Sequence, residues 1–304
     1  MNKLSKLTTE MRNEQSMNID NMSTTDILTT INNEDMTVAT SVQQVIPEIR
    51  KTVDIVCEAL KQGGRLFYVG AGTSGRIGIL DAVECPPTYS TSPDIVQALM
   101  AGGINAMEKA VEGAEDDEGA GAKDLEKRNL TKQDVVVGIA ASGQTPYVIG
   151  ALQYANSIGA STVSLSSNED SAISRYADTN IEVITGPEVL TGSTRMKAAT
   201  AHKLVLNMIT TASMIKTGKV FENLMVDLKV SNNKLMERAK NIVSTITGVP
   251  YQEAERVLEN TNFQVKPAIV MIKTGVNYTE ATVFIEKADG FVRKAIELAL
   301  QGGN

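Results

Sequence analysis

The sequence predicts an α/β fold: a three-layer αβα sandwich with a five-stranded parallel sheet, followed by a small C-terminal helical domain. From residue 65 onward, short apolar runs alternate with segments of helical spacing, at residues 66–69, 95–100, 135–140, 162–165 and 181–184. Continuous apolar runs between helices are typical of a parallel sheet that is buried on both faces. After about residue 248 the strand pattern ends and only helical spacing remains.

The segments on either side of this sheet are predicted to be helical. Residues 23–61 have helical spacing, and Ser23 followed by Asp26 is typical of a helix start. A long helix is predicted over residues 194–216, and the tail is expected to form three helices, over residues 251–259, 266–273 and 279–300. We therefore divide the chain into a lead-in (1–47), the α/β domain (48–247) and a three-helix domain (248–304).

Composition excludes several classes of function. The chain has 304 residues, with 29 Lys and Arg against 36 Asp and Glu, and its net charge of −7 disfavours binding to nucleic acid or anionic lipid. No apolar stretch is long enough to span a bilayer, so we expect a cytoplasmic protein that does not bind membranes. Two cysteines and one histidine are too few for a zinc or iron–sulfur site, and Cys57 is expected in the core.

Three turns share one chemistry, because each is rich in Gly, Ser and Thr and each is expected to open a helix. They lie at residues 70–75 (GAGTSG), 142–145 (SGQT) and 191–194 (TGST). Backbone N–H groups and short hydroxyls at a helix start bind anions. Three such turns that converge predict a site for a phosphate ester.

Each of these turns has a simpler interpretation. The pattern Gly70-x-Gly72-x-x-Gly75 also matches a dinucleotide fingerprint, although a nucleotide-binding fold needs no second serine-rich turn. Ser142 or Thr145 could be an ordinary N-cap. Lys197, one turn after Ser193 and Thr194, is placed either to reach a bound anion or to remain in solvent.

Two acidic segments are candidates for proton transfer. Pro86 and Pro87 are expected to stop a helix and hold the backbone before them extended, which would aim Glu84 from a rigid corner. The run at residues 112–118 (EGAEDDE) is either a solvated helix start or a source of a base. His202 is expected to be a hydrogen-bonded helix residue.

Together these segments resemble a specific family, the N-acetylmuramic acid 6-phosphate etherases, which have the sugar isomerase (SIS) fold. The resemblance covers nearly the whole chain and is carried by MNIDNMST, YVGAGTSGRIGILDAVECPPTYS, VEGAEDDEGAG, GIAASGQTPYV and the long stretch from GPEVLTGSTRMKAATAHK to FENLMVDL. ECPPT and GSTRMKA are its most specific motifs. Gln144 departs from the Arg expected in many members, and His202 departs from the expected Gln.

The resemblance implies a carbon–oxygen lyase that cleaves the lactyl ether of N-acetylmuramic acid 6-phosphate in cell-wall sugar recycling, without metal or redox cofactor. It implies a homodimer whose sites form where two SIS units meet. It assigns Glu84 as the proton donor and Glu115 as the second active-site residue, which we interpret as the base. The expected substrate-binding residues are Gly72, Thr73, Ser74, Ser142, Gln144, Thr145, Ser193, Thr194 and Lys197.

Two other functions remain open at this stage. A non-catalytic sugar-phosphate sensor would share the phosphate-binding turns, but a regulator is expected to carry a basic DNA-binding domain. An aldose–ketose isomerase would share both phosphate binding and removal of the C2 proton. Release of lactate distinguishes the etherase from both.

Overall fold

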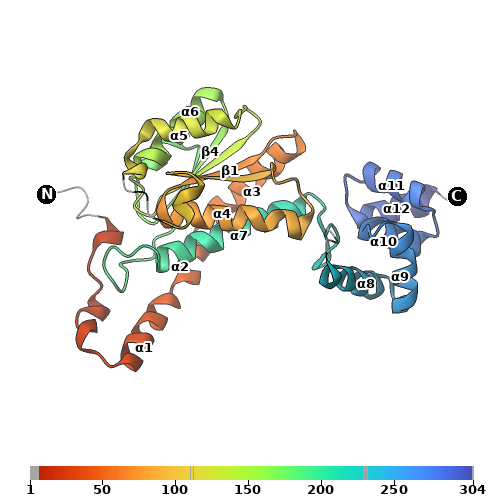
Figure 1. The fold of residues 1–304 in the computed structure, drawn as a ribbon, viewed down its shortest axis with the longest axis horizontal. Coiled ribbons are helices and arrows are strands. Elements are labelled where there is room, and N and C mark those ends of the chain that lie inside the picture. Colours follow the sequence, from red (N-terminus) through yellow and green to blue (C-terminus); the bar gives the residue numbers. More distant parts are fainter. Residues whose placement is uncertain (1–6, 110, 112, 229, 231, 303–304) are drawn as a thin grey trace. The chain divides into compact units, whose positions relative to one another are not determined.

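The predicted five-stranded parallel sheet is confirmed (Figure 1). The structure is a computed structural model that describes residues 7–302 apart from 110, 112, 229 and 231. The strands are β1 (Leu66–Gly70), β2 (Val96–Met100), β3 (Val135–Ile139), β4 (Ser161–Ser166) and β5 (Thr179–Glu182). Their order is β2-β1-β3-β4-β5, and Leu66 of β1 lies opposite both Val96 and Val135.

Helices cover both faces of the sheet, which explains why its strands are apolar on both sides (Figure 1). On one face, Phe67 and Val136 pack in a core cluster with Leu125 and Tyr147. Leu125 belongs to α5 (Glu118–Lys127), and Tyr147 belongs to α6 (Pro146–Ile158). The other face is covered by α3 (Ile46–Lys61), α4 (Gly72–Tyr89) and α7 (Lys197–Lys216).

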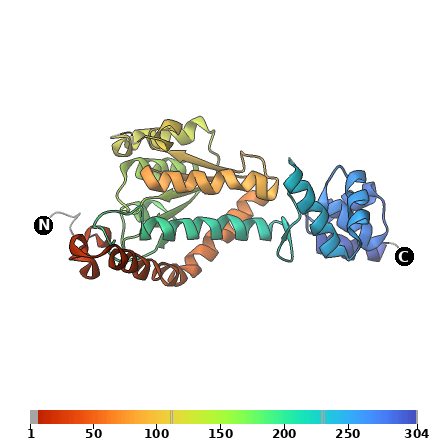
Figure 2. The same ribbon diagram turned by 60° about the horizontal axis from the view of Figure 1, so that its bottom comes forward.

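A buried carboxylate ties α4 to α7 and to the sheet. The two helices run side by side, orange and teal in Figure 2. Asp81 of α4 accepts hydrogen bonds from Tyr68 Oη at 3.0 Å, Asn207 Nδ2 at 2.6 Å and Thr210 Oγ1 at 3.1 Å. Burial raises the pKa of Asp81, while these hydrogen bonds oppose the rise. The contacts fix α4 against β1 and α7.

The expectation that Pro86 and Pro87 stop the helix before them was wrong. Both residues lie inside α4, which continues to Tyr89. Each proline removes one backbone donor from the helix, and a single remaining turn tolerates that loss. The Ser90 N–H donates to the Pro86 carbonyl at 3.0 Å, and Ser90 then leaves the helix with a φ of 52°. Glu84 therefore stands on regular helix, not on an extended corner.

The N-terminal segment is helical, as predicted. Its elements are η2 (Thr8–Glu10), η3 (Glu14–Ser16), η4 (Ile19–Asn21), α1 (Thr24–Asp35) and α2 (Val38–Gln44), followed by α3. The Asp26 N–H donates to Ser23 Oγ at 3.2 Å, so the predicted cap is confirmed. The short turns before it are fastened to the loop that precedes α7. Asn13 Nδ2 donates to the Pro187 carbonyl at 3.2 Å, and Ser16 Oγ donates to the Val189 carbonyl at 2.7 Å.

The chain divides into two compact units. The first comprises residues 1–83 and 94–210, and the second comprises residues 84–93 and 211–304. The remaining elements of the first are η5 (Ile104–Met107), η6 (Ala114–Asp116) and η7 (Ile173–Tyr176). Those of the second are β6 (Val220–Phe221), β7 (Leu224–Met225), α8 (Asn233–Thr247), α9 (Tyr251–Asn260), α10 (Val265–Thr274), α11 (Tyr278–Lys287) and α12 (Val292–Gly302). The domain boundaries at residues 47 and 247 stay a prediction.

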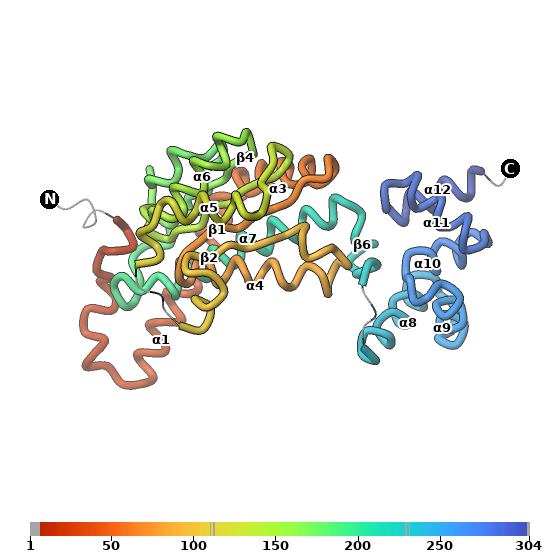
Figure 3. Tube along the Cα trace, turned by 45° about the horizontal axis from the view of Figure 1, so that its top comes forward, coloured from red at the N-terminus to blue at the C-terminus, as the bar shows by residue number. Residues whose placement is uncertain are grey.

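The C-terminal helical region is present, but one of its helices was predicted wrongly. Residues 279–300 were expected to form a single helix, whereas α11 and α12 are separate (Figure 3). Asp289 and Gly290 between them have φ values of 54° and 82°. Left-handed backbone cannot continue an α-helix, and the apolar spacing on either side of the break conceals it in the sequence. Leu258, Ile269 and Ala295 pack in the core of this unit.

Candidate functional site

The predicted turns meet in a small pocket at the carboxyl ends of β1 and β3. These neighbouring strands are the point where the strand order reverses, which is where open α/β sheets bind ligands. The pocket has a volume of about 170 Å³. Its lining residues are Glu10, Ala71, Gly72, Thr73, Ser74, Glu115, Ala140, Ala141, Ser142, Thr145, Gly192, Thr194, Ala199 and His202.

Two helix N-termini supply the pocket with anion-binding groups. Gly70 ends β1, and a Cβ there would lie 2.8 Å from the Gly75 backbone nitrogen, so glycine allows α4 to begin directly after the strand. The second helix, α6, starts at Pro146 after Thr145, whose side chain makes no capping hydrogen bond. Amide groups and the positive end of each helix dipole therefore combine with the hydroxyls of Thr73, Ser74 and Ser142.

The third turn differs from the prediction that it opens a helix with available amides. The long helix begins at Lys197 rather than at residue 194. The Lys197 and Ala198 N–H groups both donate at 3.0 Å to the carboxylate of Glu188, which is 1% exposed. Because this carboxylate already caps α7, the turn contributes Thr194 and Gly192 to the pocket but no helix N-terminus.

Three residues expected to bind substrate do not line the pocket. The Lys197 ammonium is buried in an ion pair with Glu34 of α1. Gln144 is exposed, and its backbone N–H donates to Ser142 Oγ at 3.2 Å. The Ser193 N–H donates to the Leu190 carbonyl at 2.9 Å. The sequence places these three residues in or next to turns that line the pocket, but residue spacing does not show in which direction a side chain points.

The two predicted catalytic carboxylates are placed differently. Glu115 is exposed on η6 and lines the pocket. Glu84 does not line it: this residue is exposed on α4, twelve residues after Gly72, or about 18 Å along the helix axis. In the acidic run, Asp117 caps α5 by accepting from the Ala120 N–H at 3.0 Å, and Glu112 lies outside the described residues.

The pocket also contains two ionisable residues for which no binding role was predicted, Glu10 and His202. Glu10 comes from the N-terminal segment, where neither spacing nor composition gave a signal. His202 was predicted to be a hydrogen-bonded helix residue, and its ring does contact Ser167 Oγ at 3.1 Å. Burial lowers the pKa of His202 to about 4. The imidazole is therefore neutral near pH 7.

Burial of His202 is expected to make the protein acid-sensitive. The unfolded chain takes up a proton near pH 6.5, whereas the folded chain does so only near pH 4. Stability is therefore fully present above pH 6.5 and is lost as pH falls towards 4. We expect His202 to lower the free energy of unfolding by about 2 kcal/mol between pH 7 and pH 5.

Urea unfolding at pH 7 and at pH 5 measures this loss of stability. The His202→Gln variant should lack the share of the loss that comes from protonation of His202. An equal acid loss in the variant and in the unmodified protein would show that other groups cause it.

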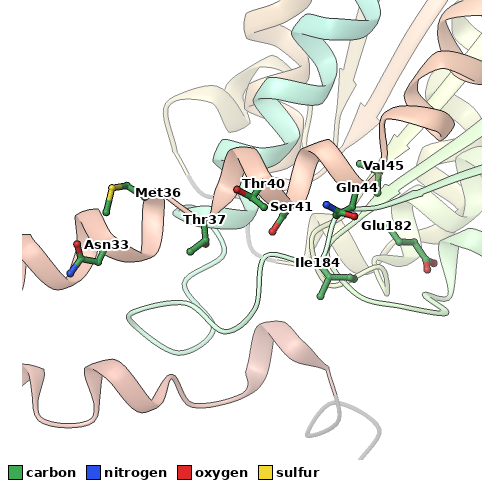
Figure 4. A pocket seen from close by; sticks show the side chains of 9 residues that line it. All are labelled: Asn33, Met36, Thr37, Thr40, Ser41, Gln44, Val45, Glu182 and Ile184. Carbon is green, nitrogen blue, oxygen red and sulfur yellow. The ribbon is translucent and has the colours of Figure 1, made fainter.

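A larger groove lies beside the edge strand β5 (Figure 4). Its volume is about 680 Å³, and it holds none of the predicted site residues. The close-up shows Thr37, Thr40 and Gln44 on one side and Ile184 on the other. Glu182 is the ionisable side chain in its lining, and its carboxylate accepts from the Asp170 and Ser171 N–H groups and from Ser174 Oγ. Size alone therefore does not mark the candidate site.

Two further observations concern the described residues only. Among them, no group of three or more His, Cys, Asp or Glu side chains is arranged to hold a metal ion. None of the described helices has the length and apolar character needed to cross a membrane.

The fold and the pocket define an SIS-domain protein. Residues 48–156 match the glucokinase regulatory protein N-terminal SIS domain, and residues 110–212 match the SIS domain. Residues 222–268 match the C-terminal lid domain of glucokinase regulatory protein. Among solved structures, a phosphoheptose isomerase from Francisella tularensis is 17% identical with a TM-score of 0.48, covering 63% of this chain and 98% of that one.

Curated relatives define the family more narrowly. N-acetylmuramic acid 6-phosphate etherase 1 of Bacillus licheniformis is 57% identical over 295 residues, which cover 97% of each chain. The N-acetylmuramic acid 6-phosphate etherase of Bacillus subtilis is 56% identical over 294 residues, again 97% of each chain. The chain belongs to the N-acetylmuramic acid 6-phosphate etherase family, as the sequence motifs predicted.

Proposed function

We propose that this protein cleaves the D-lactyl ether of N-acetylmuramic acid 6-phosphate, releasing D-lactate and N-acetylglucosamine 6-phosphate in cell-wall sugar recycling. The supporting observation is the pocket itself in a chain 57% identical to a named etherase. Helix N-termini and hydroxyl groups in the pocket suit a phosphate, and the carboxylate of Glu115 lines the same pocket. A cytoplasmic location is part of the proposal, because a charged sugar phosphate does not cross a membrane unaided.

The chemistry is an elimination followed by addition of water, which makes the enzyme a carbon–oxygen lyase. When the sugar ring is open, C1 is an aldehyde and the proton on C2 is acidic. We assign Glu115 as the base that removes this proton. An alkoxide is a poor leaving group, so an acid must protonate the ether oxygen as lactate leaves C3 with its hydroxyl restored, and we assign that role to Glu84. Water then adds at C3, and the proton taken from C2 is replaced from solvent.

A second copy of the chain would complete this site. The pocket of about 170 Å³ is smaller than most small-molecule sites, and Glu84 lies outside its lining. Apolar side chains are exposed next to Glu84 on α4, with Leu80 at 51% and Val83 at 56%, and Met208 on α7 is 41% exposed. Such residues are typical of a surface covered by a partner. We therefore propose a homodimer in which each protomer brings Glu84 to its partner's pocket.

Isotopic labelling tests the proposed function. The purified protein is incubated with N-acetylmuramic acid 6-phosphate in heavy-oxygen water, and the masses of both products are measured by mass spectrometry. Elimination and hydration place solvent oxygen at C3 of the sugar, whereas attack on the lactyl carbon would place it in lactate. An isomerase would rearrange the sugar without releasing lactate, and a sensor would bind it unchanged. Solvent oxygen in lactate, a rearranged sugar without lactate, or an unchanged sugar would each refute the proposal.

The phosphate-binding role of the turns predicts a selective loss of affinity. Ser74→Ala and Ser142→Ala should each weaken sugar-phosphate binding by about 1–3 kcal/mol, because a charged oxygen loses a buried donor. Titration calorimetry measures the change. Ser157→Ala, on the exposed face of α6, is the matched control and should bind normally. If the non-phosphorylated sugar turned over as fast as the phosphorylated one, the anion site would have no role.

A further inference from the structure

Glu10 is held at the opening of the pocket by the residue before it. Thr9 is 1% exposed, and its carbonyl accepts from the Gly192 N–H at 3.2 Å. Its N–H donates to Asn168 Oδ1 at 3.4 Å, and its hydroxyl accepts from Asn168 Nδ2 at 3.2 Å. These bonds fasten the N-terminal segment to two loops, so Glu10 enters the pocket from a fixed backbone.

The same network reaches the serine-rich turn after β3. Asn168 Nδ2 also donates to the Ala141 and Ser142 carbonyls, at 3.0 Å and 3.3 Å. The Glu10 carboxylate lies over Gly192, where an added Cβ would be 3.3 Å from Oε2. Glu10 is therefore positioned relative to the turns that carry Ser142 and Thr194, although Glu10 and Thr194 are 184 positions apart in the sequence.

The charge of Glu10 does not suit the phosphate. A carboxylate only accepts hydrogen bonds, and beside an anion it is repulsive. Glu10 is exposed, and within the described residues its carboxylate makes no hydrogen bond or ion pair, so its acceptors face solvent. A ligand with hydroxyl or amide donors next to its phosphate would use them. A sugar phosphate has that arrangement, and inorganic phosphate does not.

We propose that Glu10 is a sugar-recognition residue whose carboxylate accepts a hydrogen bond from a hydroxyl or amide N–H group of the ligand. It deepens the proposed function and rests on it. The hydroxyls and helix N-termini hold the phosphate, and Glu10 selects for the part of the ligand that carries donors. Its negative charge also disfavours phosphate alone, so one side chain raises affinity for the sugar ester and lowers it for the free anion.

Calorimetry with two probes tests this assignment on the full chain. N-acetylglucosamine 6-phosphate and inorganic phosphate are titrated into the unmodified protein, into Glu10→Gln and into Glu14→Gln. Glu14 is the matched control, because it is exposed on η3 of the same segment and does not line the pocket. For Glu10→Gln we expect the sugar phosphate to bind roughly ten- to a hundredfold more weakly and inorganic phosphate to bind equally or more tightly.

Opposite or divergent responses of the two probes cannot arise from a damaged pocket, which would weaken both. Parallel loss of both affinities would overturn the assignment, and so would unchanged affinity for the sugar phosphate. A normal unfolding temperature for Glu10→Gln confirms that the comparison is between folded proteins. If the unmodified protein binds the sugar phosphate but releases no lactate from the etherase substrate, the proposed function fails while the recognition role of Glu10 is still tested.

Discussion

Glu84→Gln is expected to lower the rate of lactate release by roughly 10²–10⁴-fold, the usual contribution of a general acid. The amide keeps the shape of the side chain but has no carboxyl proton to give to the ether oxygen. Because Glu84 is exposed on regular helix, the fold and the affinity for the sugar phosphate should not change. Initial rates of D-lactate release and calorimetry on the same preparation measure the two effects. A variant with near-normal lactate release would remove Glu84 from the mechanism.

Mixed dimers show which protomer supplies Glu84. If each pocket combines Glu115 of one chain with Glu84 of the other, a dimer of one Glu84→Gln chain and one Glu115→Gln chain has one intact site. Random mixing of the two variants should therefore recover about a quarter of the unmodified activity, since half the dimers are mixed and each has one active site of two. If one chain supplies both groups, mixing recovers nothing.

Glu115→Gln is expected to lower lactate release by a similar factor, roughly 10²–10⁴-fold, and to stop hydrogen exchange at C2. The carboxylate lines the pocket next to the turns that would hold the phosphate, and an amide cannot accept the C2 proton. The reaction in deuterium oxide measures this step, because the product of the unmodified protein should carry deuterium at C2.

The neighbouring Asp116 provides a control. It is exposed on the same short turn and does not line the pocket, so Asp116→Asn should react normally. If Glu115→Gln exchanged the C2 hydrogen at the normal rate but released no lactate, another group would be the base.

The sheet could be predicted from the sequence because its signal is local. All five residues of β1 and of β3 are buried, so each strand appears as a continuous apolar run. Helix ends were less predictable. Pro86 and Pro87 are ordinary stop signals, yet α4 passes through both of them. Asp289 and Gly290 break a helix inside an apolar pattern that continues on both sides.

The site was only partly predictable for a related reason. Thr73, Ser74 and Ser142 sit in turns whose composition reveals their chemistry, and all three line the pocket. The capping of α7 by Glu188 and the pairing of Lys197 with Glu34 depend on side-chain directions that spacing does not encode. Glu10 could not be found at all, because its position depends on contacts with residues far along the chain.

The hydrogen bonds between Thr9 and Asn168 have a consequence for how the protein folds during synthesis. The two residues are 159 positions apart, and closing so long a loop costs entropy that early contacts do not repay. During synthesis, Thr9 can dock on Asn168 only after Asn168 has left the ribosome, and on Gly192 only after Gly192 has. The N-terminal segment is therefore made first, but its contacts with both loops can be complete only after all five strands of the sheet and Gly192 have been synthesised.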